Sequence, residues 1–285
     1  YASIGEAFSQ LSGVFNLGVD GIMLVGAFIG FFVALHTGNL WLALLAAAIA
    51  GLLMGLLMSL ISVTLKAEQG ISGIGLYMFG LGLSSLLFKK LVGTVITIPG
   101  FSAVRIPILG KIPFIGDILF NQSLLVYGAF LLVPLAWWIL EKTTLGLKIK
   151  AAGQNPAAAD TLGVNVDKIR YFSVCFGSAL AGIAGASLSL SLVNLFQENL
   201  TAGQGFIAVA LVYFGGWTPL GILGGALLFS TVNSIQLWMQ VLNVNIPYDV
   251  LLMMPYVLTI AVLASAVSRV HQPAALNRPF ERGEN

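Results

Sequence analysis

Residues 42–58 read LALLAAAIAGLLMGLLM, and this uninterrupted apolar run decides the fold class. A bilayer core about 30 Å thick needs roughly 20 apolar residues for one helical crossing. In lipid, the backbone amides must bond within a helix or within a closed barrel. Barrel strands alternate apolar and polar residues over about ten positions, which this run does not do. The sequence therefore predicts an all-α integral membrane protein, a polytopic helix bundle.

The composition of the whole chain supports the same class. Of 285 residues, 58% are apolar and 8% are charged, whereas a soluble domain carries about 25% charged residues. The small net charge of +2 does not indicate a nucleic-acid partner. A single cysteine, Cys175, excludes an intrachain disulfide and a thiolate metal cluster. We expect membrane lipid around the chain, and no metal or cofactor within it.

Apolar segments divide the chain into membrane crossings. We expect them at about 17–35, 41–65, 71–92, 123–140, 171–195, 205–216, 219–240 and 250–268, the sixth being too short to span. The chain, 1–285, is expected to form one domain: a first half to about 140, a polar loop at 141–170, a second half at 171–268 and a tail at 269–285. Because Tyr1 stands in what reads as a continuing segment, we expect an N-terminal helix to be missing.

The distribution of Lys and Arg predicts the orientation, because cytoplasmic loops carry an excess of both. If 141–170 is cytoplasmic, the cytoplasmic side holds Lys66, Lys142, Lys148, Lys150, Lys168, Arg170, Arg269, Arg278 and Arg282. The other side then holds Lys89, Lys90, Arg105 and Lys111. The proline-rich loop 93–122 falls on this outer side, either as a surface that meets a soluble partner or as a mere connection.

Two regions interrupt the pattern of simple spanning helices. They are LSGVFNLGVDGIMLVG at 11–26 and GQGFIAVALVYFGGWTPLGILGG at 203–225. Each region leads from a short apolar helix through a polar break, HTGNLW or GGWTPLG, to a helix rich in small residues. We interpret them as broken or half-spanning helices and as an inverted-topology repeat, the usual construction of a transporter.

Polar residues at membrane depth mark the candidate substrate pathway, because they are costly in lipid unless they serve a function or join helices. Aromatic residues that could stack on a ring-shaped solute complete the set. The predicted pathway residues are Asn16, Asp20, Tyr77, Phe79, Asn194, Phe206, Asn233 and Gln236. Asn233 and Gln236 stand three apart, on one helical face. A purely structural role, as interhelical hydrogen bonds or lipid-facing rings, is the alternative for each.

The loop at 141–170 contains the signals of a short helix outside the bilayer. Asn155 is a good N-cap, Pro156 suits the first helical position and Gly163 suits a C-terminal stop. We therefore expect a helix at 156–162, either as a solvated connector or as a binding element.

Three motifs together resemble the permease subunits of bacterial ATP-binding-cassette (ABC) importers. They are SGVFNLGVDGIMLVGAF, LGLKIKAAGQNPAAADTLGVNV and AGQGFIAVALVYFGGWTPLG, in the family's order and across nearly the whole chain. The branch is the one of branched-chain amino acid, ribose-type sugar and nucleoside permeases. The later MMPYVLTIAVL, with the third motif, looks most similar to the simple-sugar and nucleoside permeases.

The resemblance implies a multi-pass protein of the bacterial plasma (inner) membrane that moves a small neutral solute by alternating access. A nucleoside is the first expectation, with a simple sugar or a branched-chain amino acid as alternatives. The implied partners are an ABC ATPase subunit, a second permease chain and an extracytoplasmic solute-binding lipoprotein. The implied coupling residues are Ala151, Ala152, Gly153, Gln154, Asn155, Pro156, Ala157, Ala158, Ala159, Asp160 and Gly163.

The sequence itself favours an energy source on another chain. It contains no GxxxxGK[ST] phosphate loop. An ion-coupled transporter or channel would need ionisable pairs within its spans, and none falls at helical spacing. A membrane-embedded enzyme would need a catalytic cluster of His, Asp, Glu or Cys, and no such cluster is evident. We therefore expect a transport subunit without enzymatic activity, with ATP used by its partner.

Overall fold

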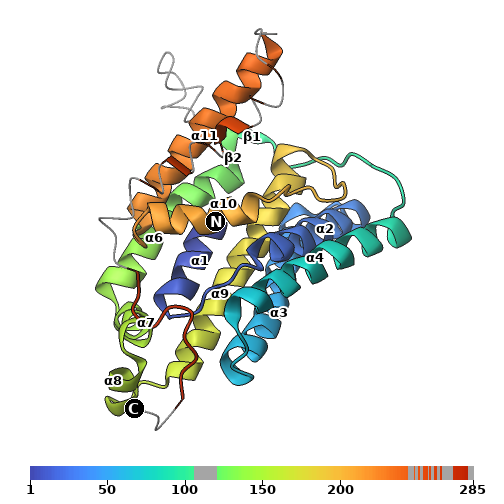
Figure 1. Ribbon diagram of the computed structural model, residues 1–285. Helices are drawn as coiled ribbons and strands as arrows, with labels where there is room; N and C mark the ends of the chain where they lie inside the picture. The colour runs from blue at the N-terminus through green and yellow to red at the C-terminus, as the bar shows by residue number, and fades with distance from the viewer. Residues whose placement is uncertain are drawn as a thin grey trace.

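The computed structural model describes residues 1–105, 121–242 and 272–281, with scattered positions between 247 and 264. The described part is almost entirely helical (Figure 1). Its helices are, in chain order, α1 (Ala2–Leu11), α2 (Val19–Thr37), α3 (Leu40–Ser59), α4 (Gln69–Leu91), α6 (Leu124–Lys142), α7 (Thr144–Gln154), α8 (Pro156–Thr161), α9 (Val166–Ser187), α10 (Gln204–Phe214) and α11 (Pro219–Val241). Two π-helical turns, η1 (Leu60–Thr64) and η3 (Leu188–Leu192), extend α3 and α9.

Six helical segments in the described part are long and apolar enough to cross a membrane. They are Val19–Thr37, Leu40–Thr64, Gln69–Leu91, Leu124–Lys142, Val166–Leu192 and Pro219–Val241. These six segments, together with the short α10, confirm seven of the eight expected apolar segments. The eighth, at 250–268, lies largely outside the described residues.

Helix α9 runs through the middle of the bundle and packs against α1, α2 and α3 (Figure 1). It lies antiparallel to α3, and small residues bring the two backbones together. A Cβ atom added at Gly51 would stand 2.3 Å from the carbonyl oxygen of Ser178, and one added at Gly182 would stand 2.3 Å from that of Ala47. Only glycine permits this approach, which is the way that membrane helices pack without a hydrophobic driving force.

The bundle has two polar ends, which we call the α8 end and the hairpin end. The α8 end carries α7, α8 and residues 272–281, while the hairpin end carries β1 (Ala103–Arg105) and β2 (Asn121–Ser123) (Figure 1). The two strands are antiparallel, with Val104 opposite Gln122. The segment before β1 packs on the bundle, because the Ile98 and Phe101 amides donate to the carbonyl oxygens of Asn194 and Leu190. Part of the expected outer loop, 106–120, lies outside the described residues.

Helix α1 was not predicted from the sequence, which gave no segment before residue 17. All of its residues are buried, including Ser3, Glu6, Ser9 and Gln10. A helix that is enclosed on every side by protein can carry polar side chains, so it leaves no apolar run in the sequence. The expected break within 11–26 is confirmed, since α1 ends at Leu11 and α2 begins at Val19.

The proposed repeat pairs α2 and α3 with α10 and α11, and it stays a prediction. The two first helices differ in length, because α2 has 19 residues and α10 has 11. Only α10 is therefore short in the way that the sequence suggested for both. The N-termini of α2 and α10 nevertheless meet, since the backbone amide of Gly205 binds Asp20 at the start of α2.

The close approach of α3 and α9 makes a testable prediction. Gly182→Ala places a methyl group against the rigid backbone of Ala47, and overpacking of this kind costs about 1–3 kcal/mol. We expect the unfolding temperature in detergent to fall by several degrees. Gly75→Ala on α4 is the matched control, because no atom lies within 4 Å of a Cβ at that position. Equal unfolding temperatures for the two variants would contradict the packing.

Candidate functional site

The break between α1 and α2 is held by side chains rather than by helical hydrogen bonds. The backbone amide of Phe15 donates to Oε1 of Gln69 at 2.8 Å, and that of Asn16 donates to Oε1 of Glu6 at 3.1 Å. Oδ1 of Asn16 in turn accepts the Gly18 amide at 2.9 Å. Asn16, predicted as a pathway residue, is thus buried and occupied in shaping the entry to α2.

Asp20 joins this break to the second interrupted region. It is fully buried, and its two carboxylate oxygens accept from two different donors. Oδ1 accepts the Gly205 amide at 2.7 Å, and Oδ2 accepts the Thr201 hydroxyl at 3.0 Å. The carboxylate therefore sits at the N-terminus of α10, where unpaired amides and the helix dipole favour a negative charge.

A second buried carboxylate, Glu6, was missed by sequence reasoning. Its Oε1 accepts Nε2 of Gln10 at 2.9 Å, and Oε1 of Gln10 accepts Nε1 of Trp217 at 2.8 Å. This chain of bonds ties α1 to the turn between α10 and α11. The spacing of Glu6 and Gln10, four apart on one helical face, was the available signal. It could be used only once 2–11 was recognised as a helix.

The structure brings together only some of the predicted pathway residues. Tyr77 and Phe206 pack edge to face, with ring centroids 5.1 Å apart, close to the Asp20 cluster. Phe79 is 51% exposed on the outside of α4. Asn194 lies at the hairpin end in a left-handed turn, with φ of 55°. On α11, Asn233 is exposed and Gln236 is buried. Their roles in transport stay predictions.

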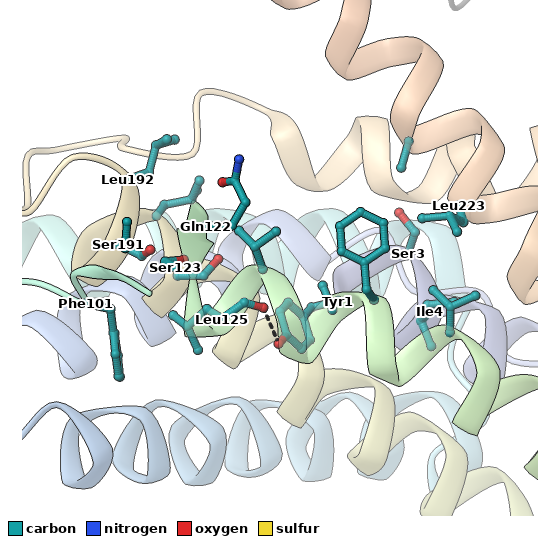
Figure 2. Close-up of a pocket in the computed structure, with 18 of the residues that line it drawn as sticks. Tyr1, Ser3, Ile4, Phe101, Gln122, Ser123, Leu125, Ser191, Leu192 and Leu223 are labelled. Carbon is teal, nitrogen blue, oxygen red and sulfur yellow. Dashed lines mark hydrogen bonds between the residues drawn. The ribbon is translucent and has the colours of Figure 1, made fainter. Parts of the chain in front are cut away.

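A cavity of about 540 Å³ opens near the hairpin end, and none of the predicted pathway residues lines it. Its walls come from the start of α1, the hairpin, α6, η3 and the start of α11 (Figure 2). The polar and aromatic residues lining it are Tyr1, Ser3, Phe101, Asn121, Gln122, Ser123, Phe130, Ser187 and Ser191. Figure 2 shows the Tyr1 hydroxyl donating to the carbonyl oxygen of Leu125, at 2.7 Å.

The cavity has the size and composition of a small-molecule site. None of its lining residues has a charged side chain. The buried hydroxyl of Ser123 has no hydrogen-bond partner within the described part of the chain. Isolated serines on apolar helices carry little signal in a sequence, and the residues that meet here come from distant segments. This cavity could therefore not be predicted from the sequence.

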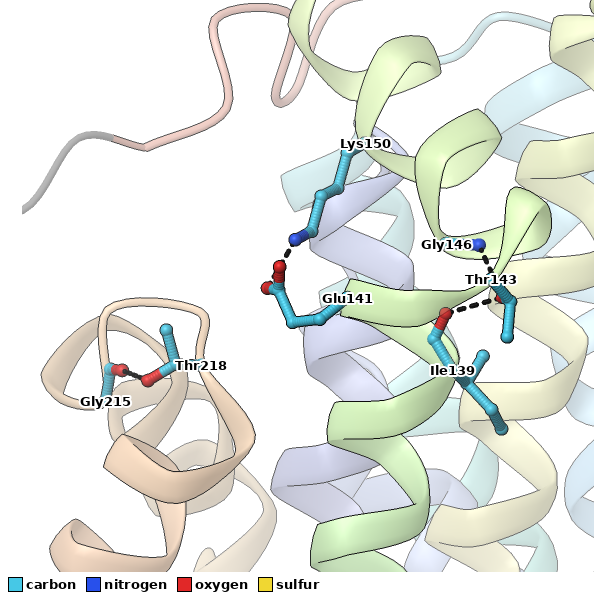
Figure 3. Close-up of polar contacts among 7 residues, drawn as sticks. All are labelled: Ile139, Glu141, Thr143, Gly146, Lys150, Gly215 and Thr218. Carbon is cyan, nitrogen blue, oxygen red and sulfur yellow. Dashed lines mark hydrogen bonds and ion pairs between the residues drawn. The ribbon is translucent and has the colours of Figure 1, made fainter.

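A tight corner connects α6 to α7 at the α8 end (Figure 3). The Thr143 hydroxyl donates to the Ile139 carbonyl at 2.6 Å and accepts the Gly146 amide at 3.2 Å. Lys150 pairs with Glu141 across the corner. Figure 3 also shows the α10–α11 turn, where the Thr218 hydroxyl donates to the Gly215 carbonyl. The corner fixes the direction in which α7 and α8 leave the bundle.

The predicted short helix is confirmed as α8. Asn155 caps it through the Ala158 amide at 3.0 Å, and Pro156 occupies its first turn. Gly163 follows in the left-handed conformation, with φ of 83°. Helix α7, which precedes it, was not predicted. Leu162 is 84% exposed directly after α8, although it was not among the predicted coupling residues.

The predicted coupling residues divide into two groups. Ala152, Gly153 and Ala159 are buried and face the permease itself. A Cβ at Gly153 would stand 2.1 Å from the Leu11 carbonyl oxygen, so α7 lies directly on the end of α1. The remaining predicted positions are partly or fully exposed: Ala151, Gln154, Asn155, Pro156, Ala157, Ala158, Asp160 and Gly163.

A polytopic bundle with broken helices, with buried polar side chains at the breaks and with two short helices at one end, has the architecture of a membrane permease. The chain belongs to the family described as the permease component of the branched-chain amino acid transport system, whose profile matches residues 1–263. It is thus a multi-pass plasma-membrane subunit of an ABC importer. It is not an enzyme, because ATP hydrolysis takes place on a separate ATPase, and a solute-binding protein is the other partner that the family implies.

Relatives of the chain agree with this assignment over nearly its full length. It is 38% identical to the "Putative glucose ABC transporter permease protein TsgC13" of Haloferax volcanii, covering 99% of this chain and 93% of the relative. It is 37% identical to the guanosine ABC transporter permease protein NupQ of Bacillus subtilis, covering 99% and 92%. It is 35% identical to the nucleoside ABC transporter permease protein NupC of Lactococcus lactis, covering 96% and 90%. No solved structure matches the chain.

The contact between Asp20 and α10 predicts a graded loss of stability. Asp20→Ala leaves the Gly205 amide and the Thr201 hydroxyl without an acceptor, at about 1–3 kcal/mol for each buried group. Asp20→Asn keeps one carbonyl oxygen and should lose clearly less. Thermal unfolding in detergent measures both variants. If the two are equally damaged, or neither is, the carboxylate does not hold α10 as described.

Proposed function

We propose that this permease carries an uncharged polar solute, with a nucleoside as the first candidate, and that the cavity at the hairpin end receives it. The observation that carries the proposal is the lining of that cavity, which combines serine hydroxyls, amides and aromatic rings without a charged side chain. A nucleoside has a ring that stacks on Phe130 or Phe101 and hydroxyl groups that bond with serines. The relatives named for guanosine and nucleoside transport support this choice.

A simple sugar is the second candidate, since one relative is named for glucose. Hydroxyl groups and aromatic faces suit a sugar as well. The third candidate, a branched-chain amino acid, fits the residues of the described part less well. A zwitterion needs groups of opposite charge, and the only Lys or Arg buried in the described part is Arg170, at the α8 end.

The α8 end is the cytoplasmic end in this proposal, and the ATPase subunit binds there. The distribution of the cations supports this orientation. Of the ten Lys and Arg residues in the described part, three lie at the hairpin end, Lys89, Lys90 and Arg105. The other seven lie at the α8 end: Lys66, Lys142, Lys148, Lys150, Lys168, Arg170 and Arg278. The exposed residues of 151–163, which include Leu162, form the proposed docking surface. An exposed leucine directly after a short helix outside the bilayer suits a small apolar contact at the centre of an interface with a protein partner.

The packing suggests how the ATPase drives the permease. Helix α7 rests on the end of α1 through Gly153 and Leu11. Displacement of α8 therefore acts on the break at 12–18, and from there on the Glu6–Gln10–Trp217 chain and on Asp20. The start of α11 lines the cavity, so its turn can transmit the movement to the solute. This is alternating access with the broken helices as hinges.

Two further partners belong to the proposal. A solute-binding lipoprotein would deliver solute at the hairpin end, near residues 93–105 and the exposed Gln197–Asn199 stretch. A second permease chain, identical or homologous, would cover apolar surface that the bundle leaves open. Helix α11 offers such a surface, with Trp238 68% exposed and Val241 77% exposed.

Competition for uptake tests the solute. The complete importer, reconstituted in proteoliposomes, is given radiolabelled guanosine with ATP and an excess of unlabelled guanosine, glucose or leucine. We expect only the nucleoside to abolish uptake of the label. If an excess of glucose or leucine abolishes uptake of the label as completely as guanosine does, or if labelled guanosine does not enter while labelled glucose or leucine enters parallel vesicles, the nucleoside assignment is overturned.

The cavity itself is tested by a matched pair of aromatic residues. Phe130 lines the cavity and is 41% exposed, whereas Phe79 on α4 is 51% exposed outside it. Loss of a stacking contact worth about 0.5–1.5 kcal/mol should raise the apparent KM roughly two- to tenfold for Phe130→Ala. Phe79→Ala should leave it unchanged. A larger rise in the apparent KM for Phe79→Ala than for Phe130→Ala would place the pathway along α4 instead.

Docking at α8 is tested by a charge at Leu162. Leu162→Asp puts a carboxylate into the proposed contact. We expect the amount of ATPase subunit that copurifies with the permease to fall at least tenfold, and ATP-driven uptake to fall in parallel. Leu162→Met conserves volume and apolarity and should retain both. Normal assembly of the Asp variant would contradict docking at this residue.

A further inference from the structure

The tail residues 272–281 lie along residues 151–163, the proposed coupling segment, at the α8 end (Figure 1). The backbone amide of Ala275 donates to the Gly153 carbonyl at 2.9 Å. The amide of Ala274 donates to Oε1 of Gln154 at 3.4 Å. Both acceptors belong to the last turn of α7, next to α8. The tail is thus attached directly to the segment on which the ATPase is proposed to bind.

The same tail is attached to the interior of the permease. The Asn277 amide donates to the Gly13 carbonyl at 3.2 Å, within the break between α1 and α2. Arg170, which is 1% exposed, donates from Nε to the Ser12 carbonyl at 3.2 Å and from Nη1 to the Arg278 carbonyl at 3.0 Å. One buried guanidinium therefore holds the break and the tail together.

A third attachment joins the tail to the loop between α3 and α4. Lys66 forms an ion pair with Glu281 at 2.8 Å. The carboxylate of Glu68 caps α4, and its pKa is lowered by hydrogen bonds from the Ile71 and Gly70 amides and also by the side chain of Asn277. With three separate attachments, the tail has a fixed position before any partner binds.

A groove of about 460 Å³ runs between the tail and the coupling segment. One wall consists of the end of α7 and the start of α8, from Gln154 to Ala157. The other wall is the tail, with Ala274, Ala275 and the stretch from Arg278 to Glu281. The coupling segment alone would present a convex surface, whereas the tail turns this surface into a concave one.

We propose that the tail is the second wall of the docking site for the ATPase subunit, with the coupling segment as the first. This inference rests on the proposed function, since it takes docking at α8 as given. The groove is continuous with that surface and is built partly from the same residues. Arg278 is exposed and lines the groove. Its positive charge would be complemented by an acidic residue on the face of the ATPase that enters the groove.

The test uses Arg278, because its side chain can be changed without removing the bond that fixes the tail. Arg170 binds the backbone carbonyl of residue 278, not the side chain. Arg278→Glu in the full chain should weaken binding of the purified ATPase subunit at least tenfold, and raising the salt concentration should weaken wild-type binding. Arg278→Lys keeps the charge and should bind within a fewfold of wild type. The unfolding temperature of each permease variant without the ATPase is measured alongside.

Each outcome decides the proposal. Reduced binding with an unchanged unfolding temperature, and retention by the lysine variant, supports the tail as a docking wall. Normal binding of Arg278→Glu overturns it. A loss of binding by Arg278→Glu that comes with a clear fall in the unfolding temperature of the permease alone also overturns it, because the tail would then only stabilise the permease. If Leu162→Asp prevents assembly while Arg278→Glu does not, the proposed function stands and this inference alone fails.

Discussion

Two helices of this permease begin inside the bundle, and the backbone donors at their first turns must find acceptors there. Water and lipid cannot supply them at that depth, so side chains do. Asp20 serves the first turn of α10, and Asn16 serves the entry to α2. Glu6 then serves the amide of Asn16 itself. The other features of the interior follow from the need to bury these polar side chains among protein groups only.

This requirement explains why α1 is enclosed and why the central helices approach so closely. A helix with Glu6 and Gln10 on it cannot face lipid, so α9, α10 and the break must surround it. Close packing along Gly51 and Gly182 keeps the rest of the bundle narrow enough to do so. The break and the α10–α11 turn are joined by Trp217 and Gln10, so neither can move independently of the other. In the proposed mechanism, these linked interruptions of the helices act together as the hinge.

The sequence predicted the parts of the fold that face lipid and the parts that obey local rules. Long apolar runs gave six spanning segments and α10, and the signals at Asn155, Pro156 and Gly163 gave α8. It failed where burial by protein replaces burial by lipid, as in α1, and where a helix is amphipathic and short, as in α7. The resemblance to ABC permeases identified the family correctly, because three motifs occurred in order.

For the candidate site, the sequence identified residue types but not the groups that these residues contact. Asp20 and Asn16 were singled out as polar groups at membrane depth, and both are buried. Their partners, Gly205 and Gly18, are backbone groups that no pattern reveals as acceptors or donors for a side chain. The cavity at the hairpin end is assembled from distant segments, and its serines are unremarkable on each helix alone. Long-range juxtaposition of this kind is fixed by packing, which one sequence does not display.

The energy source can be argued from how the buried carboxylates are used. Glu6 and Asp20 are the acidic residues buried in the described part of the chain, and each is bound by backbone and side-chain donors from neighbouring segments. A carboxylate that couples transport to an ion must exchange that ion with water during the cycle, whereas these two support helix ends and would release them if they changed partners. In the proposed mechanism, work enters mechanically at the α8 end, where α7 meets α1 at Gly153 and the ATPase subunit can act on the break between α1 and α2.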